Sequence, residues 1–211
     1  MSMVNFLSKE IHCKIVYFGP GLGGKTTNIL QIYQKFVHQE GKLLRLNTEN
    51  ERTLFFDFLP LELGEIRGMK TRFHLYSVPG QNFYQASKRV ILKGLDGIVF
   101  VADSQLERMD ENLESMKNLK DSMENFLQTP LENVPGVMQW NKRDLPNITS
   151  IQELEEKLNP MKWPSLSACA QNGEGVFETL KLIGKLTLAH LKIQDLGNNV
   201  KNSIKTKENF Y

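Results

Sequence analysis

A glycine-rich segment, GPGLGGKT at residues 19–26, constrains the fold more than any other part of the sequence. It fits the pattern G-x-x-x-x-G-K-[ST], in which glycines let backbone N–H groups turn inward around phosphate oxygens. An apolar run, 11–18, precedes it, and a segment of helical periodicity, 25–37, follows it. A helix that begins near Lys25 would add the positive end of its dipole to the loop. We therefore expect a strand, a phosphate-binding loop and a helix, in preference to a plain glycine-rich turn.

Two side chains at the end of this segment suit phosphate chemistry. Lys25 can reach the outer phosphates of a nucleotide as a point charge, and the Thr26 hydroxyl can be offered to Mg²⁺. The residues of this segment that we expect to contact the nucleotide are Gly19, Gly21, Leu22, Gly23, Gly24, Lys25, Thr26 and Thr27.

The rest of the chain alternates apolar runs with segments of helical periodicity. Strands are expected at 42–47, 71–78, 97–103, 136–140 and 165–169, and helices at 83–93, 110–127, 151–158 and 176–191. Segment 48–68 shows no clean periodicity. This pattern predicts an α/β fold with a mostly parallel sheet of about six strands and helices on both faces. Ligands bind such sheets at the carboxyl ends of the strands.

Composition limits the class of protein and its domains. The 211 residues predict one domain over 1–193, followed by a polar tail, 194–211, expected to be disordered or ordered by a partner. The net charge of +2, from 26 basic and 24 acidic residues, argues against a nucleic-acid partner. Cys13 and Cys169 lie in apolar stretches, as reduced thiols do. With no membrane span, signal peptide or lipidation site recognised, we expect a cytoplasmic monomer without a direct membrane anchor.

A polar segment, NKRD at residues 141–144, follows the expected strand 136–140. The Asp144 carboxylate can accept hydrogen bonds from N1–H and the exocyclic amine of guanine, a pair of donors that adenine does not present there. Leaving a carboxylate unpaired is costly, so such a contact discriminates strongly between bases. The Lys142 stem would pack along the base. A charged turn is the alternative interpretation.

A short segment, SAC at residues 167–169, adds a weaker signal because it follows another apolar strand. The Ala168 N–H could be offered to the base oxygen. The residues expected at the base are Asn141, Lys142, Asp144, Ser167, Ala168 and Cys169.

The phosphate loop, NKRD and SAC in this order resemble the small Ras-like GTPases, over residues 8 to 192. The segment SVPGQ, 77–81, is similar to the D-x-x-G-Q segment of that family, with Ser77 in place of the Asp. Together with ERTLFFDFLP and RFHLY, this departure resembles the MglA subfamily of bacterial small GTPases. The resemblance implies a P-loop GTPase that binds GTP and GDP with Mg²⁺ and hydrolyses GTP slowly without an activating partner.

The same resemblance implies a biological setting. MglA-like proteins act as polarity switches in cells that glide or use type IV pili, and a Roadblock-fold partner, MglB, accelerates their hydrolysis. We accordingly expect an MglB-like partner, effectors that the sequence does not identify, and recruitment to the cell poles through partners.

The resemblance also assigns residues to the reaction. It implies that Gly80 senses the γ-phosphate through its N–H, that Gln81 orients the attacking water, and that Thr53 closes on Mg²⁺ together with Thr26. Arg52 would be an arginine finger supplied by the same chain, a group that can contribute about 10³–10⁵ in rate. A surface cation before an aromatic turn is the alternative for Arg52.

Ser77 raises a question about the metal, because the missing Asp normally holds a water on Mg²⁺. Three acidic residues could replace it, and the sequence does not choose among them: Glu49, Asp57 and Asp103.

Three functions therefore compete. The favoured one is a slow GTPase that acts as a binary switch. A nucleotide-gated adaptor with little or no hydrolysis is supported by Ser77 and opposed by Gln81 and Arg52. A P-loop ATPase or kinase is opposed by the NKRD segment.

Overall fold

The structure is a computed structural model that describes residues 3–5, 8–36, 44–45, 57–66, 68–78 and 90–208. Side chains are described for residues 8–36, 68–78 and 90–192.

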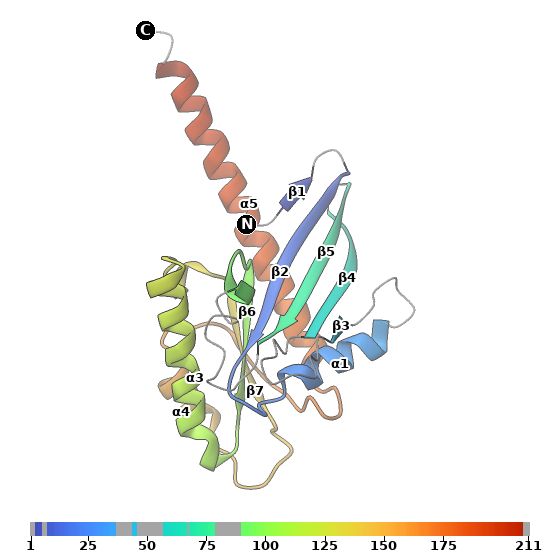
Figure 1. Ribbon diagram of the computed structural model, residues 1–211, viewed down its shortest axis with the longest axis vertical. Helices are drawn as coiled ribbons and strands as arrows, with labels where there is room; N and C mark the ends of the chain where they lie inside the picture. Colours follow the sequence, from blue (N-terminus) through green and yellow to red (C-terminus); the bar gives the residue numbers. More distant parts are fainter. Residues whose placement is uncertain are drawn as a thin grey trace, which may run out of the picture.

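A single twisted sheet forms the centre of the molecule (Figure 1). Its strands run in the order β3-β4-β5-β2-β6-β7-β8, and β1 pairs with β2. The pairs from β5 to β8 are parallel, whereas β1, β3 and β4 pair antiparallel. The predicted α/β fold with a mostly parallel sheet is confirmed, with eight strands in the described part of the chain instead of about six. The strands are β1 (Met3–Asn5), β2 (Glu10–Phe18), β3 (Leu44–Arg45), β4 (Asp57–Ile66), β5 (Met69–Ser77), β6 (Gly97–Asp103), β7 (Gly136–Asn141) and β8 (Ser165–Ser167).

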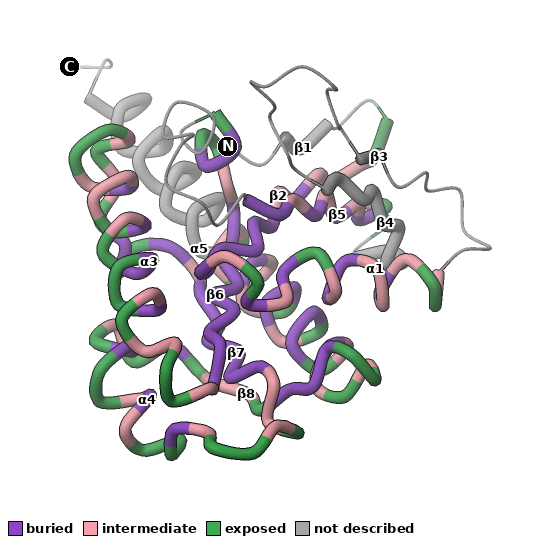
Figure 2. The backbone as a smooth tube through the Cα atoms, turned by 60° about the horizontal axis from the view of Figure 1, so that its bottom comes forward, coloured by how far each residue is buried: buried purple, intermediate pink, exposed green. Residues whose placement is uncertain are grey.

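Helices cover both faces of the sheet, because alternate residues of the central strands are apolar on both sides. On one face, Cys13, Ile15 and Tyr17 of β2 pack with apolar residues of α1 and α5. On the other face, Val16 and Phe18 of β2 pack with α3 and α4. Figure 2 shows β6 buried along its length, as expected for a strand between two helical layers. The helices are α1 (Lys25–Phe36), α3 (Met109–Asp121), α4 (Ile151–Leu158) and α5 (Val176–Glu208), with short turns η2 (Leu106–Arg108), η3 (Ser122–Phe126) and η4 (Leu131–Asn133).

The sequence predicted neither β1 nor β4. Strand β4 is the longer of the two. It lies in the segment without clean periodicity and pairs antiparallel with β5, from Phe58 opposite Tyr76 to Ile66 opposite Met69. Its register shifts between Glu62 and Glu65, which disturbs the alternation that would mark a strand. The neighbouring expected strand, 42–47, is described only as the two residues of β3.

Two expected helices also differ from the structure. The expected helix 110–127 is α3 only to Asp121 and then widens into the π-helical turn η3. Of the expected helix 83–93, residues 83–89 lie outside the described residues, and 90–92 are helical.

The tail 194–211, expected to be disordered or ordered by a partner, has a helical backbone to Glu208 in the structure. Helix α5 continues from Val176 to Glu208, so the boundary expected at 193/194 falls inside one element (Figure 1). No proline occurs between residues 176 and 211, and proline is the residue that most strongly ends a helix. Residues 209–211 lie outside the described residues. Within the described residues, none of the helices combines the length and the apolar character that crossing a membrane requires.

Both cysteines are buried free thiols, as the sequence predicted. Burial, together with the negative charge of Asp96, raises the pKa of the Cys13 thiol to about 12. A thiol with such a pKa stays protonated and unreactive at neutral pH.

A histidine pair joins β2 to β5. His12 Nδ1 lies 2.9 Å from His74 Nε2, and the two rings are stacked with centroids 5.2 Å apart. Glu10 lies 3.3 Å from His12 Nε2 and 3.1 Å from Arg72. Burial, followed by the positive charges of His12 and Arg72, lowers the pKa of His74 below its ordinary value of 6.5.

This lowered pKa predicts that the protein loses stability in weak acid. The unfolded chain takes up a proton at His74 at a higher pH than the folded chain, so stability falls as the pH drops below 6.5 toward the folded pKa. We expect His74→Gln to flatten the dependence of the unfolding free energy on pH between about 7.5 and 5.5. Urea denaturation at several pH values measures this, with His190→Gln on α5 as the control. An unchanged slope in His74→Gln would contradict the assignment.

Candidate functional site

The glycine-rich segment forms the loop between β2 and α1, as the sequence predicted. Gly19, Leu22 and Gly24 have φ angles of 142°, 61° and 102°, which fold the backbone back on itself. Lys25 is buried, and its Nζ donates to the carbonyl oxygens of Gly19 at 2.9 Å and Pro20 at 2.5 Å. The lysine ammonium is therefore held against the inner wall of the loop.

Three further residues of this segment, Leu22, Thr26 and Thr27, are at least partly exposed, so a ligand can reach them. Leu22 is 87% exposed at the tip of the loop. Thr26 is exposed in the first turn of α1, and Thr27 is half-buried. Thr26 is therefore an exposed residue at a helix N-terminus, where anions bind favourably.

The loop packs so closely that it requires glycine at two positions. A Cβ at Gly19 would lie 2.2 Å from the carbonyl oxygen of Val101, and a Cβ at Gly24 would lie 2.1 Å from Asn141 Nδ2. The loop thus rests directly on β6 and on the end of β7.

This contact gives a test of the loop. Gly24→Ala should lower the unfolding free energy by about 2–4 kcal/mol, because it adds a clash to a left-handed backbone. Gly68→Ala is the matched control, since Gly68 has a φ of 75° but a Cβ there would meet nothing within 4 Å. The control should lose only the backbone part, about 1–2 kcal/mol. Equal losses in chemical denaturation would contradict the close contact with Asn141.

Asn141 joins the phosphate loop to the loop that follows β8. Its side chain is buried, its Nδ2 donates to the Gly23 carbonyl at 2.8 Å, and its Oδ1 accepts from the Ala170 N–H at 2.9 Å. The sequence predicted Asn141 at the base. In the structure its side chain also connects these two loops to the end of β7.

Asp144 and Cys169, predicted separately from the sequence, are brought together by the ends of β7 and β8. Asp144 is exposed, and its carboxylate lies near enough to the Cys169 thiol to affect the pKa of that thiol. Burial and this carboxylate raise the pKa of Cys169, which keeps the thiol protonated. The arrangement leaves an exposed carboxylate beside the loop that Asn141 anchors.

One prediction about the base is wrong. The Ala168 N–H is donated to the Trp140 carbonyl at 2.8 Å, which extends the pairing of Trp140 with Ser167 by one bond. It is not free to meet a base oxygen. The residues that lie against Asn141 and Asp144 begin at Cys169 and Ala170, two positions later than predicted, and Ser167 is an exposed residue of β8. The left-handed glycines at 173 and 175, just before α5, mark the end of this loop in the sequence.

Lys142 contacts the buried end of β6. Its Nζ donates to Asp103 Oδ2 at 2.5 Å and to Gln105 Oε1 at 3.2 Å. Asp103 was one of the three candidates to replace the acid missing at Ser77. Strand β2 separates the strands of Ser77 and Asp103, and the Asp103 carboxylate is fully buried and bound to Lys142. Asp103 is therefore a partner of Lys142.

Several predicted residues cannot be placed. Glu49, Arg52, Thr53, Gly80 and Gln81 lie outside the described residues, as does the side chain of Asp57 in β4. Within the described residues, no three or more His, Cys, Asp and Glu side chains are grouped so as to hold a metal ion.

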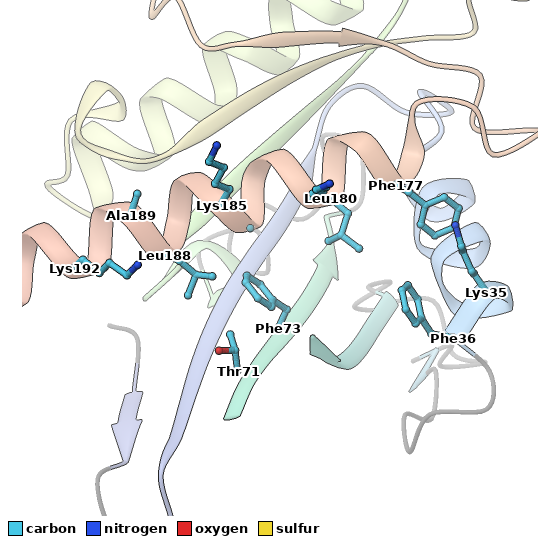
Figure 3. Close-up of a pocket in the computed structure, with 12 residues that line it drawn as sticks. Lys35, Phe36, Thr71, Phe73, Phe177, Leu180, Lys185, Leu188, Ala189 and Lys192 are labelled. Carbon is cyan, nitrogen blue, oxygen red and sulfur yellow. The ribbon is translucent and has the colours of Figure 1, made fainter. Parts of the chain in front are cut away.

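A cavity of about 860 Å³ lies away from these loops (Figure 3). The end of α1, the first half of β5 and one side of α5 line it, with Phe36, Phe73 and Leu180 inside. None of the residues predicted to bind nucleotide is among its described lining residues. The strand-end loops, and not this cavity, form the candidate site.

Comparison with known proteins agrees with this geometry. The model of the ADP-ribosylation factor family matches residues 1–187. The chain is 57% identical to the Mutual gliding-motility protein MglA of Myxococcus xanthus (strain DK1622) over 193 residues, covering 91% of this chain and 98% of that protein. It is 27% identical to the ADP-ribosylation factor-like protein 4A of Homo sapiens over 187 residues, covering 85% of each. The chain therefore belongs to the ADP-ribosylation factor family and is an MglA-like small Ras-like GTPase.

Proposed function

We propose that the chain is a GTP-operated switch in the control of cell polarity and gliding motility. It binds GTP and GDP with Mg²⁺, hydrolyses GTP slowly by itself, and presents its nucleotide state to partner proteins. The observation that carries the proposal is the double hydrogen bond of Asn141, to Gly23 and to Ala170. It joins a loop suited to phosphates to a loop suited to a base, so that both ends of one nucleotide can be held.

The described residues fit a guanine nucleotide. Lys25 and the backbone of 19–24 would hold the phosphates, and the narrow cradle at Gly24 leaves room for backbone but for no side chain. Asp144 would accept the two guanine donors. Mg²⁺ would neutralise phosphate charge, and the hydroxyl of Thr26, an exposed residue, suits it as a hard oxygen ligand.

The reaction itself would use residues outside the described part of the chain. Gln81 would orient the attacking water, Gly80 would donate its N–H to the γ-phosphate, and Thr53 would complete the metal site with Thr26. Arg52 would stabilise the charge that develops on the phosphate oxygens. A Roadblock-fold partner of the MglB type would accelerate hydrolysis by holding Arg52 and Gln81 in the productive position, since positioning alone lowers a barrier substantially.

One observation favours a second function, a nucleotide-gated adaptor with little hydrolysis. Ser77 ends β5, opposite Tyr17 of β2, and is 4% exposed. A short neutral hydroxyl occupies the buried position where the family carries an acid, which would weaken the hold on Mg²⁺.

Single-turnover hydrolysis separates the two functions. Nucleotide-free protein is loaded with GTP, and GDP formation is followed with and without a Roadblock-fold partner. For a switch we expect a rate on the order of 10⁻⁴–10⁻² s⁻¹ alone and a marked increase with the partner. Tight GTP binding without acceleration would favour the adaptor, and failure to bind GTP would reject both.

A further inference from the structure

Arg108, the last residue of η2, contacts the phosphate loop. Its Nη2 donates to the Gly21 carbonyl at 2.9 Å, although 87 residues separate the two in sequence. Its Nη1 donates to Glu111 Oε1 at 2.5 Å, and its Nε lies 3.7 Å from Asp103 Oδ2. Arg108 belongs to none of the nucleotide-binding motifs of the sequence.

Asp103 is the fixed point of this arrangement. It is fully buried, and Asn112 holds its backbone from both sides, accepting from the Asp103 N–H at 2.9 Å and donating to its carbonyl at 2.8 Å. A buried carboxylate is stable only when it is paired and hydrogen-bonded. Lys142 at 2.5 Å and Arg108 at 3.7 Å supply positive charge from opposite ends of the candidate site.

We propose that Arg108 is a positioning residue for nucleotide binding, which holds the phosphate loop through the Gly21 carbonyl and connects it, through Asp103, to Lys142. This inference rests on the proposed GTP-binding function.

The peptide geometry explains how an outer contact acts on the inside of the loop. In a trans peptide the C=O of Gly21 and the N–H of Leu22 point in opposite directions. Because the Gly21 carbonyl points toward Arg108, the Leu22 N–H points away from Arg108. There it can donate a hydrogen bond to a phosphate oxygen of the nucleotide. Leu22 also has a φ of 61°, a conformation that a leucine keeps only when its surroundings enforce it.

Glu111 offers a matched control. Its side chain is 42% exposed, and it contacts the same guanidinium without touching the loop. Exposed ion pairs of this kind contribute little, so Glu111→Gln should leave nucleotide binding nearly unchanged. The hydrogen bond from Arg108 to the Gly21 carbonyl is different. Losing one charged hydrogen bond changes an equilibrium constant, here that of nucleotide binding, by about tenfold or more.

The test measures the dissociation rates of fluorescent GDP and IDP from the full chain. Arg108→Ala should release both nucleotides about tenfold faster, while the ratio of the two rates stays at the wild-type value, because Asp144, which would distinguish the two bases, does not contact Arg108. Arg108→Lys keeps a positive charge beside Asp103, so its thermal stability should be close to that of wild type. It loses the planar guanidinium that contacts the Gly21 carbonyl, so it should still release nucleotide faster than wild type.

Three outcomes would overturn the inference. They are a wild-type dissociation rate in Arg108→Ala, an equal acceleration in Glu111→Gln, and a changed ratio of GDP to IDP release. If Arg108→Ala does not fold, Arg108→Lys carries the test, and a wild-type rate there would overturn it as well. A wild-type protein that binds no guanine nucleotide would instead reject the proposed function.

Discussion

Replacing Asp144 by Asn should move the preference of the protein from guanine to xanthine nucleotides. The Asp144 carboxylate can accept two hydrogen bonds from guanine, and Asn presents a donor amine in place of one acceptor. Xanthine carries an oxygen where guanine carries its amine, so the new donor finds a partner there. Losing one charged hydrogen bond costs ~1.5–3 kcal/mol, which predicts that GTP affinity falls by at least about 10–10².

Competition between GTP and XTP for the purified protein measures this exchange. Glu153→Gln is the control, because it removes one exposed carboxylate on α4, where Glu153 pairs with Lys157. A variant that retained its preference for GTP over XTP would show that Asp144 does not read the base.

The Asp144→Asn variant also tests the effect of Asp144 on Cys169. Since the Asp144 carboxylate contributes to the raised pKa of that thiol, alkylation should begin at a lower pH in Asp144→Asn than in wild type.

If the proposed Roadblock-fold partner accelerates hydrolysis, replacing Arg52 by Ala should remove most of that acceleration, while GTP affinity stays nearly unchanged. An arginine finger acts on charge that develops in the transition state, and it contributes about 10³–10⁵ in rate. A finger permanently in place would give fast unassisted hydrolysis and a poor switch. We therefore expect the partner to position Arg52, and not to donate a catalytic group of its own.

Two variants, one of the partner and one of this chain, show whether the partner positions Arg52 or donates a catalytic group of its own. Both are measured by single-turnover hydrolysis in the presence of the partner. A partner stripped of its interface arginines should still accelerate the reaction, provided that it still binds. Arg72→Ala is the control in this chain, since Arg72 pairs with Glu10 on the sheet. A fully active Arg52→Ala protein would make Arg52 an ordinary surface cation.

Features fixed by local sequence were predicted well. The glycines at 19 and 24, followed by Lys25, specify a tight loop and a helix start within eight residues, GPGLGGKT. The NKRD segment was placed correctly at the end of β7 because a buried strand and its polar end are adjacent in sequence.

Features fixed by contacts between distant segments were not predicted. Strand β4 depends on pairing with β5, and the shift between Glu62 and Glu65 hides its alternation. Ala168 was assigned to the base because the sequence does not reveal that its N–H continues the pairing of β7 with β8. The partnership of Arg108 with Gly21 spans 87 residues and leaves no local signal.

We propose that the loops joined by Asn141 form one site for a guanine nucleotide. Calorimetric titration of nucleotide-free protein with GDP, GTP and ATP in the presence of Mg²⁺ tests it most directly. We expect both guanine nucleotides to bind at least about 100-fold more tightly than ATP, as a base read by paired hydrogen bonds requires. Equal affinity for ATP and GTP, or no binding of either, would contradict it.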